Sequence, residues 1–188
     1  MKTLQILILA WVILLVENPA GAQSTNTNKT QNKTNTMTST EQNKAMVRTI
    51  YEQALNKRNF GLLKELISSD FTGIRGMKGP EAFEEPVAGV IKAVPDAQWS
   101  IETLMAETDK VFIWWKLKGT NTGPFQGLAA TGNAIVNDGV AVYQIRDGKV
   151  VASQILTDRL NFLQQLEVLP ADITVLYNNK KAAASESR

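Results

Sequence analysis

The sequence predicts an α+β fold in which N-terminal helices pack against a strongly curved antiparallel sheet of about four strands, followed by a short C-terminal helix. Three observations predict it. Apolar residues recur at helical spacing between residues 41 and 95, and they alternate with polar residues between residues 97 and 157. Turn-forming pairs such as Asp147-Gly148 separate the alternating segments. Because helices on one face of such a sheet leave a cavity beneath its curve, the fold predicts a pocket for a small ligand.

Three helices are expected before the sheet. Residues 41–57 carry one apolar stripe, and residues 60–67 carry a second, shorter one. The third helix begins at Pro80, a favoured first helical residue, and has glutamates in its first turns. Pro86 lies inside this helix and is expected to kink it, and Pro95 ends it.

The first two strands form a predicted hairpin. The first strand starts near residue 97 and turns at residues 108–110 into a second strand over residues 111–120. One face of the first strand is expected to carry Trp99, Ile101, Thr103 and Met105. In the second strand, alternation places Trp114 and Trp115 on opposite faces, so at most one of them can line the cavity.

Two further strands and a helix complete the predicted domain. The third strand covers residues 132–146, with a bulge expected near Asp138-Gly139. The Asp147-Gly148 turn leads into a fourth strand over residues 149–157. A short helix over residues 159–166 follows.

The first residues are expected to be a cleavable signal peptide over residues 1–22. Lys2 supplies a positive charge, residues 4–16 are apolar except for Gln5, and Ala20-Gly21-Ala22 provides the small residues that signal peptidase needs. An uncleaved anchor is the alternative, but the apolar run is shorter than the about 20 residues that span a bilayer. Cleavage after Ala22 predicts a secreted or periplasmic protein without stable membrane association.

The remaining chain divides into three predicted parts. Residues 23–43 are almost entirely Ser, Thr, Asn, Gln and Lys, a composition typical of a disordered polar linker. Residues 44–170 form the folded domain, and residues 171–188 form a C-terminal tail.

The composition excludes several classes of function. The chain contains no histidine and no cysteine, so it lacks the usual ligands of zinc, copper, haem and iron–sulfur clusters, and neither a metal nor another cofactor is expected. Its 20 basic and 18 acidic residues are interspersed and give a net charge of +2, which predicts no nucleic-acid partner. A small-molecule ligand is the expected partner. A homodimer is also expected, because an apolar outer sheet face with one of the paired tryptophans would otherwise be exposed.

Four motifs follow one another in the second half of the domain. They are residues 119–127 (GTNTGPFQG), Thr131-Gly132, residues 147–150 (DGKV), and Asp158-Arg159-Leu160 with residues 163–166 (LQQL). In this combination they resemble the signature of SnoaL-like polyketide and ester cyclases, of the nuclear transport factor 2-like superfamily. The resemblance covers about residues 45–170 and implies a cone-shaped α+β barrel.

The resemblance also implies a reaction. It implies that Asp158 is the catalytic acid/base for a cofactor-free cyclisation or isomerisation of a small apolar ligand that contains a carbonyl group. Asp158 directly precedes a predicted helix, however, where aspartate is a favoured N-cap, so a purely structural role is also open. The family often has histidine where this chain has Asn121, and a Glu-His-Trp-like cluster where it has residues 152–154.

Five further residues are the expected ligand-binding side chains: Asn121, Gln154, Tyr51, Tyr143 and Trp114. The amides can donate hydrogen bonds but cannot donate a proton. The tyrosines either present hydroxyl groups to the cavity or only anchor the packing. Two functions therefore stay open, an exported cyclase-like enzyme and an exported, non-catalytic ligand-binding or dimerisation domain.

Overall fold

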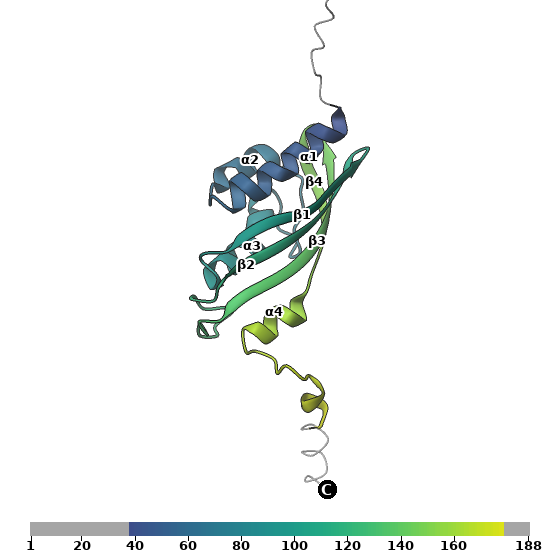
Figure 1. Cartoon of the computed structure of the whole chain (residues 1–188). Coiled ribbons are helices and arrows are strands. Elements are labelled where there is room, and N and C mark those ends of the chain that lie inside the picture. Colours follow the sequence, from purple (N-terminus) through teal and green to yellow (C-terminus); the bar gives the residue numbers. More distant parts are fainter. Residues whose placement is uncertain (1–37, 179–188) are drawn as a thin grey trace, which may run out of the picture. The chain divides into compact units, whose positions relative to one another are not determined.

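The computed structural model describes residues 38–178 (Figure 1). The predicted signal peptide and most of the predicted linker lie outside the described residues. Residues 39–43, which the composition assigned to the linker, are helical, because the Thr38 side chain accepts a hydrogen bond from the Glu41 amide and caps the helix there. None of the helices in residues 38–178 is both long enough and apolar enough to cross a membrane.

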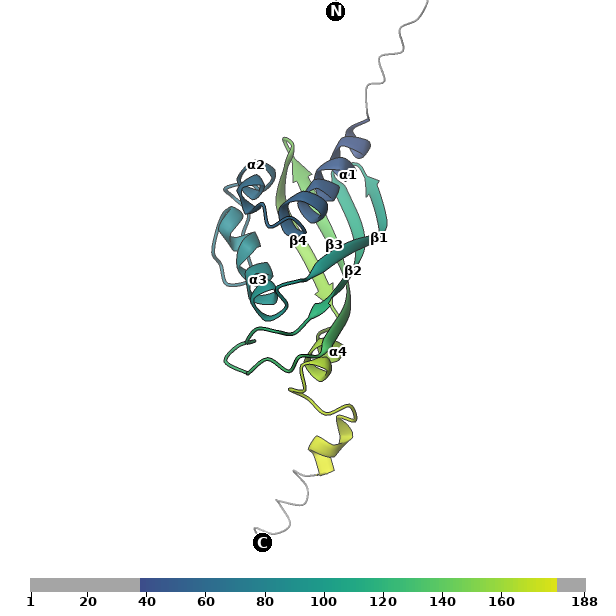
Figure 2. The ribbon, with the colours of Figure 1, turned by 60° about the vertical axis from the view of Figure 1, so that its left-hand side comes forward.

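Helices lie on one side of the sheet, as predicted (Figure 2). Helix α1, Ser39–Thr49, continues into a π-helical segment, η1, Ile50–Leu55. A short 3-10 turn, η2, Phe60–Leu62, leads into α2, Leu63–Leu66. Helix α3, Pro80–Ala93, begins at its predicted proline and contains Pro86.

The sheet has four antiparallel strands in the order β1-β2-β3-β4. These are β1, Gln98–Glu107; β2, Lys110–Thr120; β3, Ala134–Arg146; and β4, Lys149–Thr157. The sheet curves around the helices but does not close into a barrel (Figures 1 and 2). Helix α4, Arg159–Gln165, follows β4. The predicted fold class is confirmed.

A bulge in β1 changes which of its residues face the helices. The register with β2 shifts between Ile101 and Thr103. The prediction that Thr103 and Met105 share a face with Trp99 is therefore wrong. Met105 lies on the outer face and is 56% exposed, because the extra residue of a bulge reverses the alternation after it.

The bulge predicted near Asp138-Gly139 in β3 is absent. β2 and β3 pair without a register shift along their whole length, and the shift between β3 and β4 lies opposite Gln144 and Ile145, where Val151 of β4 is the extra residue. Gly139 has a different cause. A Cβ atom at Gly139 would overlap the indole ring of Trp115, its partner on β2, so only glycine lets the ring lie on the strand.

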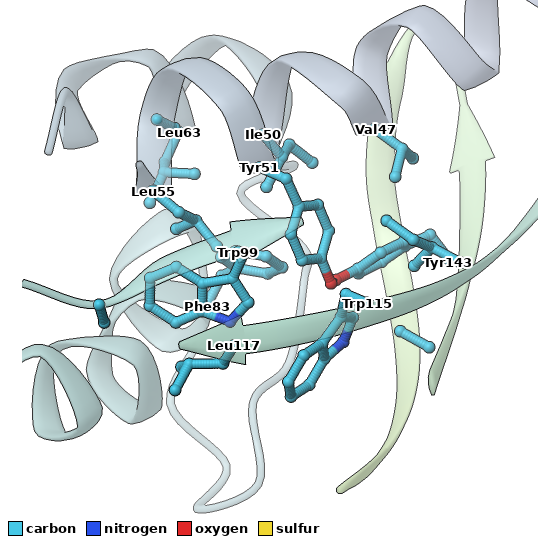
Figure 3. Close-up of a cluster of buried hydrophobic side chains, with 14 of the residues drawn as sticks. Val47, Ile50, Tyr51, Leu55, Leu63, Phe83, Trp99, Trp115, Leu117 and Tyr143 are labelled. Atoms are coloured by element: carbon cyan, nitrogen blue, oxygen red, sulfur yellow. The ribbon is translucent and has the colours of Figure 1, made fainter. Parts of the chain in front are cut away.

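The inner face of the sheet and the helices share one apolar core (Figure 3). Alternate residues of β2, including Trp115 and Leu117, point into it, so Trp115 and not the predicted Trp114 is the inward member of the pair. Ile50 and Leu63 supply fully buried side chains from the helices. Each such side chain stabilises the fold by about 1.5–3 kcal/mol relative to its exposed state.

Side-chain amides bind the backbone of the edge strand β1 and of the part of β3 that β4 does not reach. On β1, the Asn56 amide donates to the Trp99 carbonyl and accepts from the Trp99 N–H, both at 2.8 Å. On β3, β4 pairs only as far as Gly139, and beyond it the Gln165 amide of α4 accepts from the Val136 N–H at 2.7 Å and donates to the Val136 carbonyl at 2.9 Å. These amides satisfy backbone groups that no neighbouring strand reaches.

Candidate functional site

Two buried tyrosines meet in the middle of the core. Tyr51 lies in the π-helical segment η1 and Tyr143 on the inner face of β3, and their hydroxyl oxygens are 2.8 Å apart (Figure 3). Phe83 of α3 packs beside Tyr143, with ring centroids 6.1 Å apart. Short π-helical segments occur frequently at functional sites.

Burial keeps both tyrosines protonated. It raises the pKa of Tyr143 to about 12, and burial together with Tyr143 raises the pKa of Tyr51 well above its usual value. Two neutral hydroxyl groups share one hydrogen bond, so the hydrogen of the accepting hydroxyl is left over. Among the described residues no acceptor receives it. The pair therefore offers one hydrogen-bond donor in an apolar surrounding.

Asn137 is a second polar group in the core, and its Oδ1 atom has no hydrogen-bond partner among the described residues. Asn137 lies on the inner face of β3, opposite Leu117, and is 6% exposed. Its Oδ1 atom is enclosed and accepts no hydrogen bond. A buried polar atom without a partner costs about 1–3 kcal/mol of stability. Position 137 was not among the predicted site residues, although it shares the inward parity of Tyr143 on the same strand.

An apolar surface adjoins Asn137. Gly139 is the next inward residue of β3, and the ring of Trp115 lies on it. Leu117, opposite Asn137, is also buried. A flat apolar group that reaches Asn137 would therefore lie against an indole ring and an aliphatic side chain.

The inner face is uncovered along the second half of β4. Ile155 pairs with Ala141 and Thr157 pairs with Gly139, so both point to the inner side. Ile155 is nevertheless 45% exposed, and Thr157 is exposed, whereas Ala141 is buried. The inner face of β4 is thus exposed at this end, next to the buried inner face of β3.

Asn121, a predicted ligand-binding residue, is buried and fully engaged. Its Nδ2 donates to the carbonyls of Ala93 and Gly123, both at 2.9 Å. Its Oδ1 accepts from the backbone N–H and the hydroxyl of Thr131, at 2.8 and 3.0 Å. The amide joins the loop after β2 to the end of α3. This role explains Asn121 in the motif of residues 119–127 and Thr131 in the motif Thr131-Gly132.

Asp158, the predicted catalytic residue, is exposed at the N-terminus of α4. Its Oδ1 accepts from the Asn161 amide at 2.9 Å, the geometry of an N-cap. The N-cap role, which the sequence left open as an alternative to catalysis, accounts fully for this contact. The carboxylate is exposed, whereas the tyrosine pair is buried. A catalytic role for Asp158 stays a prediction.

Gln154 and Trp114 lie on the outer face of the sheet. Gln154 pairs with Val142, and Trp114 pairs with Val140, both outward residues of β3. Trp114 is 42% exposed and donates from Nε1 to Asp138 at 3.2 Å. Of the six predicted site residues, the structure brings only Tyr51 and Tyr143 together.

Charged side chains are absent from the described core, where Asn121 and Asn137 are the buried polar residues. The described residues also contain no group of three or more side chains that could hold a metal ion. A shallow groove beside α1 is lined by charged residues, but Lys44–Glu41 and Arg48–Glu52 pair with each other along the helix, as on a solvated surface.

Comparison with known proteins gives a consistent result. A family model described as SnoaL-like polyketide cyclase matches residues 45–166. The chain has no match among the curated proteins.

Solved structures share the fold. A protein from Jannaschia sp. CCS1 whose name carries the words SnoaL-like polyketide cyclase is 20% identical, with a TM-score of 0.63, over 70% of this chain and 95% of that one. AclR from Streptomyces galilaeus is 26% identical, with a TM-score of 0.63, over 79% of this chain and 96% of its own. TsrD from Streptomyces laurentii is 19% identical, with a TM-score of 0.63, over 69% of this chain and 97% of its own.

Proposed function

The chain belongs to the SnoaL-like polyketide cyclase family, and we propose that it binds a small, largely apolar, carbonyl-containing molecule on the inner side of its sheet, without acid–base catalysis by Asp158. The observation that supports this proposal best is the buried hydroxyl pair of Tyr51 and Tyr143, with one hydrogen left over. A carbonyl oxygen is an acceptor that suits such a hydrogen.

The surroundings favour an apolar ligand. The tyrosine pair lies among aromatic and aliphatic side chains, where a hydrogen bond to a carbonyl is stronger than in water. The uncovered inner face beside Ile155 is the side from which a ligand would enter. Entry requires side chains of the core to move, as when a ligand selects a minor conformation.

A cyclase is the second candidate function, and family membership favours it. It would require a base beside the bound ligand, and Asp158 is the residue that the family resemblance supplies. Because Asn caps helices as well as Asp, Asp158→Asn removes the acid without removing the cap. This variant separates the two candidates. In a cyclase, Asp158→Asn abolishes turnover of the substrate, whereas in a binding domain it leaves the affinity for the ligand unchanged.

Prodan, a naphthalene ketone whose emission shifts to the blue in apolar surroundings, tests the binding proposal. We expect saturable binding to the purified protein and about tenfold weaker binding to Tyr51→Phe/Tyr143→Phe, which has no hydroxyl left to donate. Each single variant keeps one hydroxyl and is expected to bind prodan within about twofold of wild type. Unchanged binding by the double variant, or no binding by the wild type, would contradict the proposal.

We also propose that the protein is exported. The support is the N-terminal pattern of Lys2, an apolar run and Ala20-Gly21-Ala22. Mass spectrometry of the protein recovered outside the cytoplasm is expected to show a chain that begins at Gln23. A chain that keeps Met1 would contradict it.

A further inference from the structure

The two buried asparagines of the domain differ completely in their contacts. The Asn121 amide forms four hydrogen bonds, two to backbone carbonyls and two from Thr131. Asn137 is nearly as buried, yet its Oδ1 atom accepts no hydrogen bond from any described residue. Asn121 is explained by the fold, and Asn137 is not.

An apolar side chain at position 137 would suit the fold better. The neighbouring inward residues, Ile135, Gly139 and Leu117, are all apolar, and leucine would bury no unpaired atom there. A polar residue that opposes stability in the ligand-free protein is expected where a bound molecule satisfies it.

The enclosed atom defines the chemistry of its partner. Oδ1 of an amide only accepts hydrogen bonds, so a molecule that satisfies it must present an O–H or N–H group. The ring of Trp115 on Gly139 and the side chain of Leu117 are the adjoining surfaces, and both suit a flat apolar body.

Asn137 lies at a different end of the inner face from the tyrosines. Tyr143 lies six positions after Asn137 on β3, which corresponds to about 20 Å between Cα atoms along a strand. The uncovered inward residues Ile155 and Thr157 pair with Ala141 and Gly139, between these two ends. A ligand entering there can extend towards either polar group.

We propose that the Asn137 amide is a second polar anchor of the ligand site and that the ligand carries a hydroxyl or N–H donor in addition to its carbonyl. This inference rests on the proposed function and deepens it. Asn137 then contributes to affinity and specificity, at a cost to the stability of the ligand-free protein.

β-Naphthol and its methyl ether test the inference, because they have the same ring and only the naphthol can donate a hydrogen bond. We expect the wild type to bind β-naphthol about tenfold more tightly than the ether. Asn137→Leu is expected to reduce this preference to about twofold while binding of the ether is retained. Asn137→Val is the second variant if leucine does not fit.

Thermal unfolding of the same variants without ligand supplies the second measurement. The wild type is expected to melt several degrees below Asn137→Leu or Asn137→Val, because the variants bury no unpaired atom. Melting temperatures that fall in both variants, or a naphthol preference that survives in Asn137→Leu, would overturn the inference while leaving prodan binding intact. Failure of prodan and both naphthalenes to bind the wild type would overturn the proposed function, and the inference with it.

Discussion

Removing one hydroxyl of the Tyr51–Tyr143 pair is expected to destabilise the protein more than removing both. Either single change to phenylalanine leaves the other hydroxyl buried without its partner at 2.8 Å. An unsatisfied buried polar group costs about 1–3 kcal/mol, whereas replacing both partners by apolar groups of the same shape is nearly neutral. For a domain of this size, 1 kcal/mol corresponds to about 4 °C in the melting temperature.

Urea denaturation followed by tryptophan fluorescence measures the effect. We expect the free energy of unfolding to fall by about 1–3 kcal/mol in Tyr51→Phe and in Tyr143→Phe, and to change by less than about 1 kcal/mol in the double variant. The coupling energy from the double-mutant cycle should therefore be at least about 1 kcal/mol. Tyr177→Phe is the matched control, because this tyrosine is 69% exposed.

Additive losses would refute the reasoning. If the double variant loses the sum of the two single losses, the hydroxyls do not depend on each other, and each has another partner. Single variants as stable as the wild type would show that the hydroxyls are hydrated. In either case the pair would have no spare donor for a ligand.

Four other outcomes are expected. Between pH 10 and about pH 12 the free energy of unfolding should fall by up to about 1.4 kcal/mol per pH unit for each buried tyrosine. The reason is that burial raises the pKa of each tyrosine in the folded protein, so the unfolded chain loses these protons first. Urea titrations at each pH should show a flatter profile for Tyr51→Phe/Tyr143→Phe. In urea denaturation, Asp158→Ala should lower the free energy of unfolding by about 1 kcal/mol and Asp158→Asn by less than about 0.5 kcal/mol. Equal losses in the two variants would show that Asp158 does not act as an N-cap. Gly139→Ala should cost about 1–3 kcal/mol through overlap with Trp115, and Trp115→Leu should recover part of it; a tolerated alanine would mean that the ring does not lie on the strand. Sedimentation should show a dimer at micromolar concentration, as an exposed apolar outer face favours, and a monomer for Trp114→Lys/Leu156→Lys; a monomeric wild type would refute the dimer.

Local chemistry explains why the strands after residue 108 could be predicted closely. Asp147 and Gly148 have φ angles of 52° and 70°, the left-handed conformation that a tight hairpin turn needs and that this residue pair adopts readily. The strands on either side then follow from alternation, and the fourth strand was predicted at its observed bounds, Lys149–Thr157. The helices followed in the same way from apolar spacing.

Features set by distant residues could not be predicted. The β1 bulge depends on pairing with β2, and nothing in the local alternation around Thr103 indicates it. Gly139 resembles a bulge glycine in the sequence, but its cause is a ring that comes from the neighbouring strand. A single sequence contains both residues without showing that they touch.

The site shows the same division. The helical and strand periods direct Tyr51 and Tyr143 inwards, but only the fold brings their hydroxyls together across 92 positions of the chain. Asn137 shares the parity of Tyr143, so alternation could have placed it inside, yet a partner for it, or the lack of one, is visible only in three dimensions. Asp158 and Asn121, which the motif resemblance implies as site residues, form contacts that stabilise the fold.

The amides of Asn56 and Gln165 have a consequence for how copies of this domain can meet. An unpaired strand margin is a template on which further chains can grow into fibrils, and nature often blocks it with charge or proline. Here the Asn56 amide occupies the donor and the acceptor of Trp99 on the edge strand β1, and the Gln165 amide occupies those of Val136 where β4 leaves β3 unpaired. At these two points an incoming strand finds both backbone groups already bonded, so strand addition there is blocked.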